Sequence, residues 1–290
     1  MKNKPTISVV VLTYNSGWCV RETLNSIARQ TWDGPLELVI TDDCSSDDTI
    51  AVCEEWCAEH TDRFCKVNII KGSENIGISK NMNRGCKASS GEWVKPIAGD
   101  DILEDRCLDI LHEAATTLNA HAVSSAIRVF AKSEMLSAPE TLEIWNPGEK
   151  YPVIGITEIA NNLKLWIPAP TFFLSRQMLE DIGYYPEVIR NIEDAPMLRS
   201  IVGHGYKIYN IDTPTVFYRY GHSTQVTQLK HHGIDNKYMI LKLNHMFMRD
   251  KLPFWSRTRL MINYAFRHIK YLYGKRFVSK YRYVEFTGTK

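Results

Sequence analysis

The sequence predicts an α/β protein, with a mostly parallel central sheet flanked by helices and a basic helical extension after it. Short β-branched runs alternate with amphipathic segments through the first third of the chain, which is the pattern of a parallel sheet covered by helices. The 290 residues, 44% of them hydrophobic and 23% charged, are enough for one large domain plus an appendage. Residues 249–290 hold eleven Lys or Arg and two acidic residues, so they form a separate electrostatic region.

Four strand and helix units are expected before residue 102. The run "ISVVVLTYN" is apolar throughout, as in a strand buried on both faces. Val20, Leu24 and Ile27 then recur at helical spacing, and Ser and Asp residues at the start of the second helical segment are suitable N-caps. The expected strands cover 7–15, 36–45, 66–72 and 91–101, and the expected helices 17–31, 45–60 and 77–89.

The alternation becomes less regular after residue 102. An apolar stretch at 120–130 follows a helical segment, and a polar connection at 133–152 has the composition of a long loop. A strand is expected at 207–220. The two further helices are expected over 103–118 and 156–165.

The cysteines and the N-terminal segment indicate a cytosolic protein. All seven cysteines lie in the first 107 residues without a CxxC pair or zinc-ligand spacing, as expected of reduced thiols. Cys53 and Cys57 have the spacing of core residues on one helix. The apolar run 7–12 is too short for a signal peptide, and no uncharged apolar stretch approaches the roughly 18 residues of a spanning helix. The chain is expected to be soluble or to lie on a membrane surface.

Polar side chains follow three of the four early strands. In an open α/β sheet, ligands bind beyond the carboxyl ends of the strands. An aromatic ring there can stack on a base, while carboxylates can accept from a base N–H, hold ribose hydroxyls or bind a divalent cation that carries diphosphate. The alternative for the adjacent acids 100 and 101 is that they cap the next helix. The residues concerned are Thr13, Tyr14, Asn15, Asp42, Asp43, Asp100 and Asp101.

Five ordered motifs between residues 5 and 222 resemble one known family. They are "ISVVVLTYNSG", "LELVITDDCSSDDT", "ENIGISKNMNRGCKASSGEW", "PIAGDDIL" and "IEDAPMLRSIVGHG". Their order and spacing are similar to those of the family 2 glycosyltransferases, inverting enzymes of the GT-A fold. The resemblance implies a catalytic domain over 1–225, with a nucleotide-binding half at 1–102 and an acceptor-binding half at 103–225, followed by a helical extension at 226–290.

The resemblance implies a nucleotide-sugar donor, most simply a UDP-sugar. Tyr14 and Asp43 would contact uracil, and Asp100 would touch ribose. An Arg that is common in the family's third motif is replaced here by Met82, and Arg84 or Lys80 are the candidates to substitute. The full implied nucleotide-binding set is Thr13, Tyr14, Asn15, Asp43, Asn75, Gly77, Asn83 and Asp100.

The resemblance also implies a divalent metal, Mn²⁺ or Mg²⁺, and a general base. The "AGDD" segment is similar to the family's DXD motif, with Asp101 as metal ligand, although Ala98 stands where a first acid is frequent. His222 of "FYRYGHST" would complete the metal site, one residue later than usual; its alternative is a hydrogen-bonded loop residue. Asp194 would be the general base, with Glu193 beside it facing the acceptor. The alternative for Asp194 is that it only forms part of the first turn of a helix.

Two residues are candidates for the acceptor side. Trp166 could pack on a sugar ring, or it could be a core residue. Arg219 could oppose diphosphate charge or bind the acceptor, and its alternative is a solvated surface residue.

The extension combines basic and apolar residues at helical spacing. Such a helix suits peripheral contact with an anionic membrane through residues 249–290, where a lipid-linked acceptor would be presented. The alternative is a helix packed on the catalytic domain, whose residues 1–248 carry a net charge of −7. No nucleic-acid motif accompanies the basic residues. The expected apolar stripe consists of Leu260, Met261, Tyr264, Ala265, His268, Tyr271 and Leu272.

The resemblance therefore implies an inverting, metal-assisted glycosyltransferase that extends a surface polysaccharide or glycolipid on the inner face of the plasma membrane. The acceptor would be a saccharide or a lipid-linked saccharide, and the transferred group a hexose or N-acetylhexosamine. The alternatives are a catalytically inactive nucleotide-binding homologue and a membrane scaffold in which the domain is passive.

Overall fold

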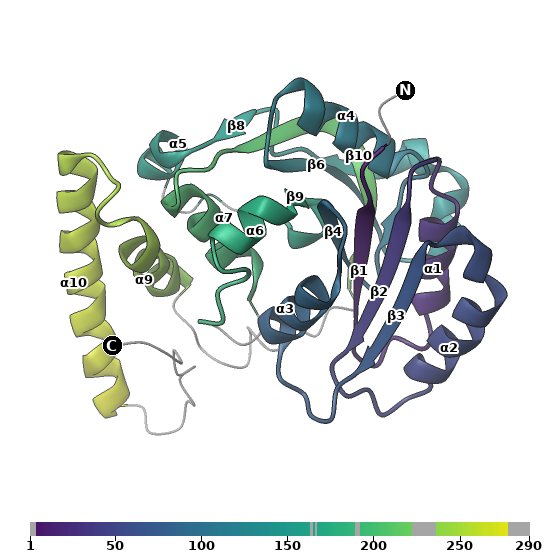
Figure 1. The fold of residues 1–290 in the computed structure, drawn as a ribbon. Coiled ribbons are helices and arrows are strands. Elements are labelled where there is room, and N and C mark those ends of the chain that lie inside the picture. The colour runs from purple at the N-terminus through teal and green to yellow at the C-terminus, as the bar shows by residue number, and fades with distance from the viewer. Residues whose placement is uncertain (1–3, 163–164, 166, 189–191, 222–235, 278–290) are drawn as a thin grey trace.

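The structure is a computed structural model that describes residues 4–162, 165, 167–188, 192–221 and 236–277 (Figure 1). Trp166 and His222 lie outside the described residues. Among the residues that are described, no helix has the length and apolar character needed to cross a membrane.

The described strands form one sheet. Its order is β3-β2-β1-β4-β9-β6-β10-β5, with β7 beside β6 and β8 beside β10. The first four strands are mutually parallel, as are β6 and β10, while β9 runs antiparallel to both β4 and β6 and joins the two parts. The bounds are β1 (Ile7–Thr13), β2 (Leu36–Asp42), β3 (Lys66–Lys71), β4 (Trp93–Ala98), β5 (Ile102–Leu103), β6 (Ala122–Phe130), β7 (Glu143–Trp145), β8 (Val153–Ile154), β9 (Phe173–Ser175) and β10 (Ile208–Arg219).

Helices cover both faces of this sheet. Val9 and Val11 of β1 point into a cluster with residues of α1, α2 and α4, while Val10 between them points into a second cluster with residues of α3, α6 and α7. This alternation follows from the two-residue period of a strand. The bounds are α1 (Val20–Ala28), α2 (Thr49–Glu59), α3 (Ile78–Ala88), α4 (Cys107–Thr117), α5 (Ile156–Asn161), α6 (Arg176–Asp181), α7 (Asp194–Gly203), α9 (Asn236–Met248) and α10 (Phe254–Phe277), with short 3-10 helices η1 (Thr61–Arg63), η2 (Ser133–Ser137), η3 (Pro139–Thr141) and η4 (Ala169–Thr171).

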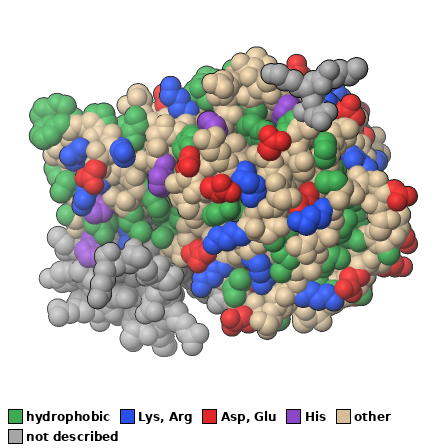
Figure 2. Space-filling model, in the orientation of Figure 1, with side chains coloured by type: hydrophobic (Ala, Val, Ile, Leu, Met, Phe, Trp, Pro, Cys, Tyr) green, Lys and Arg blue, Asp and Glu red, His purple; other side chains and the backbone are tan. Residues whose placement is uncertain are grey.

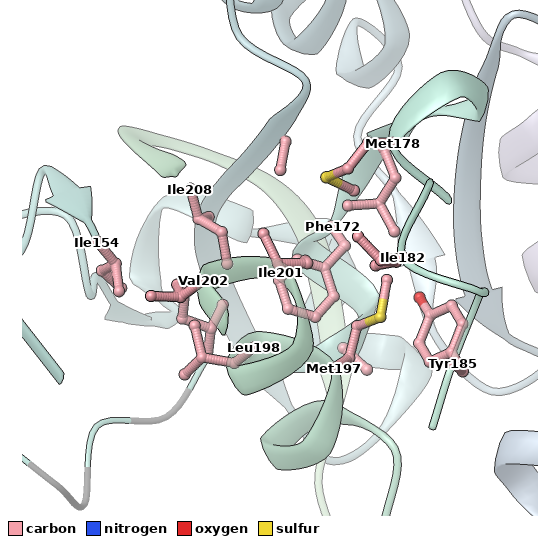
Figure 3. Packing of buried hydrophobic residues seen from close by; sticks show 14 of the residues in the cluster. Ile154, Phe172, Met178, Ile182, Tyr185, Met197, Leu198, Ile201, Val202 and Ile208 are labelled. Carbon is pink, nitrogen blue, oxygen red and sulfur yellow. The ribbon is translucent and has the colours of Figure 1, made fainter. Parts of the chain in front are cut away.

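The helix α7 lies in the centre of the second cluster. Met197 and Ile201 of this helix pack with Phe172, Met178 and Ile182, all at most 7% exposed (Figure 3). Burial on this scale stabilises each large side chain by about 1.5–3 kcal/mol and fixes the orientation of the helix. The first residue of α7, Asp194, is thereby held in a defined place.

The helices α9 and α10 form a pair on the side of α7 that is remote from β1, β2 and β3 (Figure 1). Asn244 of α9 accepts a hydrogen bond of 3.1 Å from the buried Arg199 of α7. The ring of Tyr264 in α10 stacks on that of His245 in α9 at 4.6 Å, and Leu260 is fully buried. The first turns of α10 are therefore part of the folded body, as one of the two alternatives for the extension predicted.

The expected α/β arrangement is confirmed, and two local expectations need correction. The connection at 133–152 is not structureless, because it contains β7 and two 3-10 helices. Asp100 and Asp101 do not cap α4, which begins at Cys107 with Arg106 as its N-cap. The domain bounds proposed from the sequence stay a prediction, and the segments 1–102 and 103–225 both contribute strands to the same sheet.

Candidate active site

The carboxyl ends of β1, β2 and β4 meet at one edge of the sheet, because the three strands are parallel. The chain order reverses there, since β2 lies on one side of β1 and β4 on the other. Such a switch point is where open α/β sheets bind ligands. The polar residues that the sequence placed after these strands are thus brought together.

The turn after β1 presents Tyr14 and is held by its neighbours. Asn15 adopts a left-handed conformation (φ 52°), and its side chain accepts from the backbone N–H of Ser46 at 2.9 Å. The hydroxyl of Thr13 donates to Asp42 at 2.8 Å. Thr13 and Asn15 therefore shape the turn, whereas the ring of Tyr14 is 45% exposed and is free to stack on a planar group.

Asp43 lies against the start of α3. Its two carboxylate oxygens accept from the backbone N–H groups of Ile76 and Gly77, each at 2.9 Å. Gly77 has φ 89°, a conformation that favours glycine. The nearby hydroxyl of Ser79 is 1% exposed and has no hydrogen-bond partner among the described residues. Each carboxylate oxygen retains a lone pair for a further donor.

Three further residues of the third sequence motif, Met82, Asn83 and Arg84, make contacts within the protein. Asn83 uses both ends of its amide on Tyr185, donating to the carbonyl at 2.8 Å and accepting from the N–H at 2.8 Å. Met82 is in the core. Arg84 donates to Thr41 at 3.1 Å and to the carbonyl of Asp42, so its guanidinium holds the end of β2. Lys80 is exposed. That it takes the place of the family's usual Arg stays a prediction.

The turn after β4 carries the adjacent carboxyls. Asp101 is 2% exposed and accepts a hydrogen bond of 2.9 Å from the backbone N–H of Arg219. Burial and the charge of Asp100 raise the pKa of Asp101 well above its usual range, against the lowering effects of that N–H and of the Lys95 and Arg219 charges. Asp100 is half-buried. A carboxyl in this situation is stabilised as the anion when a cation is added.

The side chain of Arg219 stabilises the Asp100–Asp101 turn. Its Nε donates to the carbonyl of Asp100 at 2.9 Å, and its terminal nitrogen pairs with Glu22 of α1 at 2.5 Å. The guanidinium lies over the ring of Phe130, 4.4 Å from its centre. With 2% exposure, Arg219 is not the solvated surface residue of the alternative interpretation, and these contacts favour a positioning role over contact with the acceptor.

Glu193 and Asp194 form the second acidic pair. Glu193 is the N-cap of α7, and Asp194 accepts from the backbone N–H of Ala195 at 2.5 Å. Negative charge is favoured at a helix N-terminus. The buried Arg199 lies one turn further on, where burial lowers its pKa to about 10 and the charge of Asp194 raises it. Asp194 is the first residue of α7, as the alternative to its role as general base predicted. A carboxylate at this position can still act as a base.

The charges of both acidic pairs act on Tyr218 of β10, which is half-buried. Burial raises the pKa of its phenol, and the charges of Asp101, Asp100, Asp194 and Glu193, in decreasing order, raise it further. The sequence analysis did not single out Tyr218, although it is the first residue of the "YRYGH" element.

Two more residues were missed. Lys95 is fully buried in β4 and donates to the carbonyl oxygens of Pro96, at 3.2 Å, and of Pro170. Its positive charge acts on Asp101. Glu22 pairs with Arg219, as described above. The signal for Lys95 was a lysine inside the apolar run "WVKPIA"; nothing in the sequence pairs Glu22 with a residue 197 positions away.

The donor set suits a hard divalent cation. Asp100 and Asp101 offer carboxylate oxygens, the ligands that Mg²⁺ and Mn²⁺ prefer, and the raised pKa of Asp101 marks a site short of positive charge. Within the described part of the chain, no group of three or more His, Cys, Asp or Glu residues is arranged to hold an ion by itself. A cation here would need ligands from the substrate or from outside the described residues.

Comparisons with known proteins agree on one family. Residues 8–183 match the family model described as Glycosyl transferase family 2. The chain is 33% identical over 111 residues to the putative glycosyltransferase EpsH of Bacillus subtilis, covering 38% of this chain and 30% of EpsH. It is 26% identical over 189 residues to the poly(ribitol-phosphate) beta-N-acetylglucosaminyltransferase TarS of Staphylococcus aureus, covering 64% of this chain and 30% of TarS. The chain thus spans about a third of the length of these curated relatives.

Solved structures share the fold. Residues 1–349 of S. aureus TarS in complex with UDP-GlcNAc superpose with a TM-score of 0.68 at 19% identity, covering 91% of this chain and 73% of that one. The mannosyltransferase PcManGT of Pyrobaculum calidifontis, in complex with GDP-Man and Mn²⁺, superposes with a TM-score of 0.62 at 18% identity, covering 91% and 70%. The fold is that of these GT-A-like transferases.

Proposed function

The chain belongs to glycosyl transferase family 2, and on that premise we propose that it moves a sugar from a nucleotide sugar to a hydroxyl of a saccharide or lipid-linked saccharide acceptor. The observation that carries the proposal is the edge of the sheet where the parallel strands β1, β2 and β4 end, which brings together Tyr14, Asp43 and the Asp100–Asp101 pair; a second acidic pair begins α7. Two carboxyl groups with different environments can divide the binding of a leaving group and the acceptance of a proton.

The donor in this proposal is a UDP-sugar. The exposed ring of Tyr14 stacks on uracil, Asp43 accepts from the uracil N–H, and Asp100 accepts from ribose hydroxyls. Thr13, Asn15, Asn75, Gly77 and Asn83 build the walls of this site. TarS, with which the fold is shared, was solved with UDP-GlcNAc, which supports a UDP-hexose or UDP-N-acetylhexosamine donor.

A divalent cation, Mn²⁺ or Mg²⁺, fits at Asp101. The carboxylate of Asp101 would hold it, with Asp100 adjacent in the chain, and His222, outside the described residues, is the proposed further ligand. When bound, the cation supplies charge neutralisation for the departing diphosphate. PcManGT was solved with Mn²⁺, which supports this assignment. The backbone N–H of Arg219 donates to the carboxylate of Asp101 and fixes its orientation.

Asp194 is the proposed general base. The acceptor oxygen attacks the anomeric carbon, its proton passes to the carboxylate of Asp194, and the bond from that carbon to the diphosphate oxygen breaks with its electrons. One in-line displacement inverts the anomeric centre. Glu193 is assigned to the acceptor side, as is Trp166, which lies outside the described residues, while Arg219 acts through the Asp100–Asp101 turn. The setting is the cytoplasm at the inner face of the plasma membrane, in surface polysaccharide or glycolipid synthesis, with residues 249–290 contacting lipid.

The test is a donor panel. Purified protein with Mn²⁺ or Mg²⁺ is given UDP-, GDP- and dTDP-sugars with saccharide acceptors, and release of the nucleoside diphosphate is followed. We expect turnover of one UDP-sugar, reduced about 10²- to 10⁴-fold in Asp194→Asn because the proton acceptor is lost. UDP affinity should be unchanged in this variant, and the exposed Asp62→Asn is the matched control.

Two outcomes would contradict the proposal. If UDP binds but no donor is consumed with any acceptor, the protein is a nucleotide-binding homologue without transferase activity. If Asp194→Asn turns over as fast as Asp62→Asn, the base is another residue.

A further inference from the structure

The helix α10 presents an apolar face that no described part of the chain covers. Phe254, Trp255, Ile262 and Phe266 are 69%, 80%, 65% and 71% exposed, and Met261 beside them is 48% exposed. Hydrophobic side chains gather over the start of α10 at the upper left of Figure 2. We call these five residues the aromatic face of α10. Single exposed apolar residues are ordinary on a protein surface, but a contiguous group with this many aromatics marks an interaction site.

The aromatic face is distinct from the side of α10 that packs on the protein. Trp255, Ile262 and Phe266 are separated by seven and four positions, so they lie on one side of a helix. Leu260 and Tyr264 lie on another side, where Leu260 is fully buried and Tyr264 stacks on His245 of α9. The helix therefore has one stripe that attaches it to α9 and a second that faces outward.

The positive charge of α10 indicates which partner binds the aromatic face. α10 contains six Lys or Arg and no acidic residue over its 24 positions. Arg259 is exposed and lies between Trp255 and Ile262 on the outward side. A helix that lies in an anionic membrane surface typically carries both aromatic and basic residues. Its aromatic side chains enter the boundary between headgroups and acyl chains, and its cations lie at the level of the lipid phosphates.

We propose that the aromatic face of α10 docks on a bilayer that contains anionic lipids, with the helix parallel to the surface. The docking face is not the stripe predicted from the sequence. Leu260, Tyr264 and His268 of that stripe are partly or fully buried, whereas Met261 and Ala265 are exposed. The proposal deepens the lipid contact that is part of the proposed function. Because lipid binding is measured without donor or acceptor, its failure is distinguishable from a failure of the proposed transferase activity.

Vesicle cosedimentation tests the proposal. The 290-residue chain is mixed with vesicles of phosphatidylcholine, alone or with phosphatidylglycerol. We expect sedimentation with the mixed vesicles only. The triple variant Trp255→Ser, Ile262→Ser, Phe266→Ser should lose binding at least about tenfold, because apolar area no longer enters the bilayer. Arg259→Gln alone should weaken binding about fivefold, as expected for one basic residue near the surface.

Matched controls separate docking from general surface effects. Ile144→Ser and Met135→Ser remove exposed apolar side chains elsewhere, and Arg29→Gln removes an exposed cation at the C-cap of α1. All three should bind vesicles like the wild type. Far-ultraviolet circular dichroism of each variant checks that α10 is still folded.

A second readout places the tryptophan in the bilayer. Lipids brominated in their acyl chains should quench part of the fluorescence of the wild type, and Trp255→Phe should bind equally but lose that quenching. The proposal is overturned if the wild type ignores anionic vesicles, if the triple variant binds as well as Ile144→Ser, or if Trp255→Phe is quenched as strongly as the wild type. Light scattering that shows a wild-type dimer, a monomeric triple variant and no vesicle binding would assign the face to a second copy of the chain instead.

Discussion

Asp101 is a buried carboxyl whose charge the protein only partly compensates. Because its pKa is raised in the folded state, its contribution to stability is complete below the pKa of an unfolded aspartate, about 3.9, and is lost as pH rises through the elevated value. The contribution of Asp101 to the stability of the metal-free protein should therefore fall from acid toward neutral pH, and Asp101→Asn should remove this part of the pH dependence. Thermal melts with a chelator measure it.

Adding Mn²⁺ supplies the control for this prediction. The cation should stabilise the wild type at neutral pH and leave Asp101→Asn unaffected, while the exposed Asp105→Asn should behave as the wild type does. An Asp101→Asn variant that still gains stability from Mn²⁺ would remove Asp101 from the metal site.

Arg219 gives a second prediction at the residue scale. Arg219→Gln removes the guanidinium that pairs with Glu22 and donates to the carbonyl of Asp100, which should lower the free energy of unfolding by about 1–3 kcal/mol. It should also weaken metal-dependent UDP binding, because the Asp100–Asp101 turn loses its brace. Urea unfolding and UDP titration measure the two effects.

The control for Arg219 is Arg128→Gln on β6, whose guanidinium donates to the carbonyl of Pro139 at 2.9 Å. It should leave UDP affinity unchanged. Equal UDP affinity in Arg219→Gln and the wild type would reduce Arg219 to a role in stability alone.

At the scale of elements, the contact of α7 with α9 links the basic extension to the proposed catalytic helix. A Cβ on Gly203 would lie 2.4 Å from the backbone carbonyl oxygen of Phe247. Gly203→Ala should force the helices apart and cost about 1–3 kcal/mol of stability, the range for overpacking. Gly155→Ala, where the nearest atom would be 3.4 Å away, is the matched control. Equal urea midpoints for the two variants would contradict this account.

The elements themselves show how far a sequence predicts such a fold. The strands and helices before residue 102 followed from apolar runs and periodicity because each buries a face locally. The three-residue strand β9 was not predicted, since its pairing with β4 and β6 depends on contacts far apart in the chain. Periodicity found one apolar stripe on α10 but could not tell a stripe that packs on α9 from one that faces outward.

The sequence predicted part of the candidate site. Tyr14, Asp43, Asp100 and Asp101 could be placed together because parallel strands end at one edge of the sheet. The contacts of Arg219 with Asp100, Asp101 and Glu22 arise only when β10 lies beside β6 and β5. The positions of Trp166 and His222 lie outside the described residues, so their roles stay proposals.

At the scale of the whole molecule, the chain divides its charge between two regions. Residues 1–248 carry a net −7 and the remaining 42 a net +9. Leu252 and Leu260 of the basic region are buried, at 2% and 0% exposure, so deleting residues 249–290 would open the core. Substitutions on the aromatic face of α10 separate the two regions without that damage. The account thus joins a nucleotide-sugar site at one edge of the sheet to a lipid-binding face on α10.

The central claim is that the edge formed by β1, β2 and β4 binds a nucleoside diphosphate together with a divalent cation. Calorimetric titration of UDP into the wild-type protein, with Mn²⁺ and with a chelator, tests it most directly. The account predicts binding with Mn²⁺, binding weaker by at least about tenfold with the chelator because the diphosphate charge is then not neutralised, and no gain from Mn²⁺ in Asp101→Asn. UDP that fails to bind, or that binds equally with and without Mn²⁺, would contradict it.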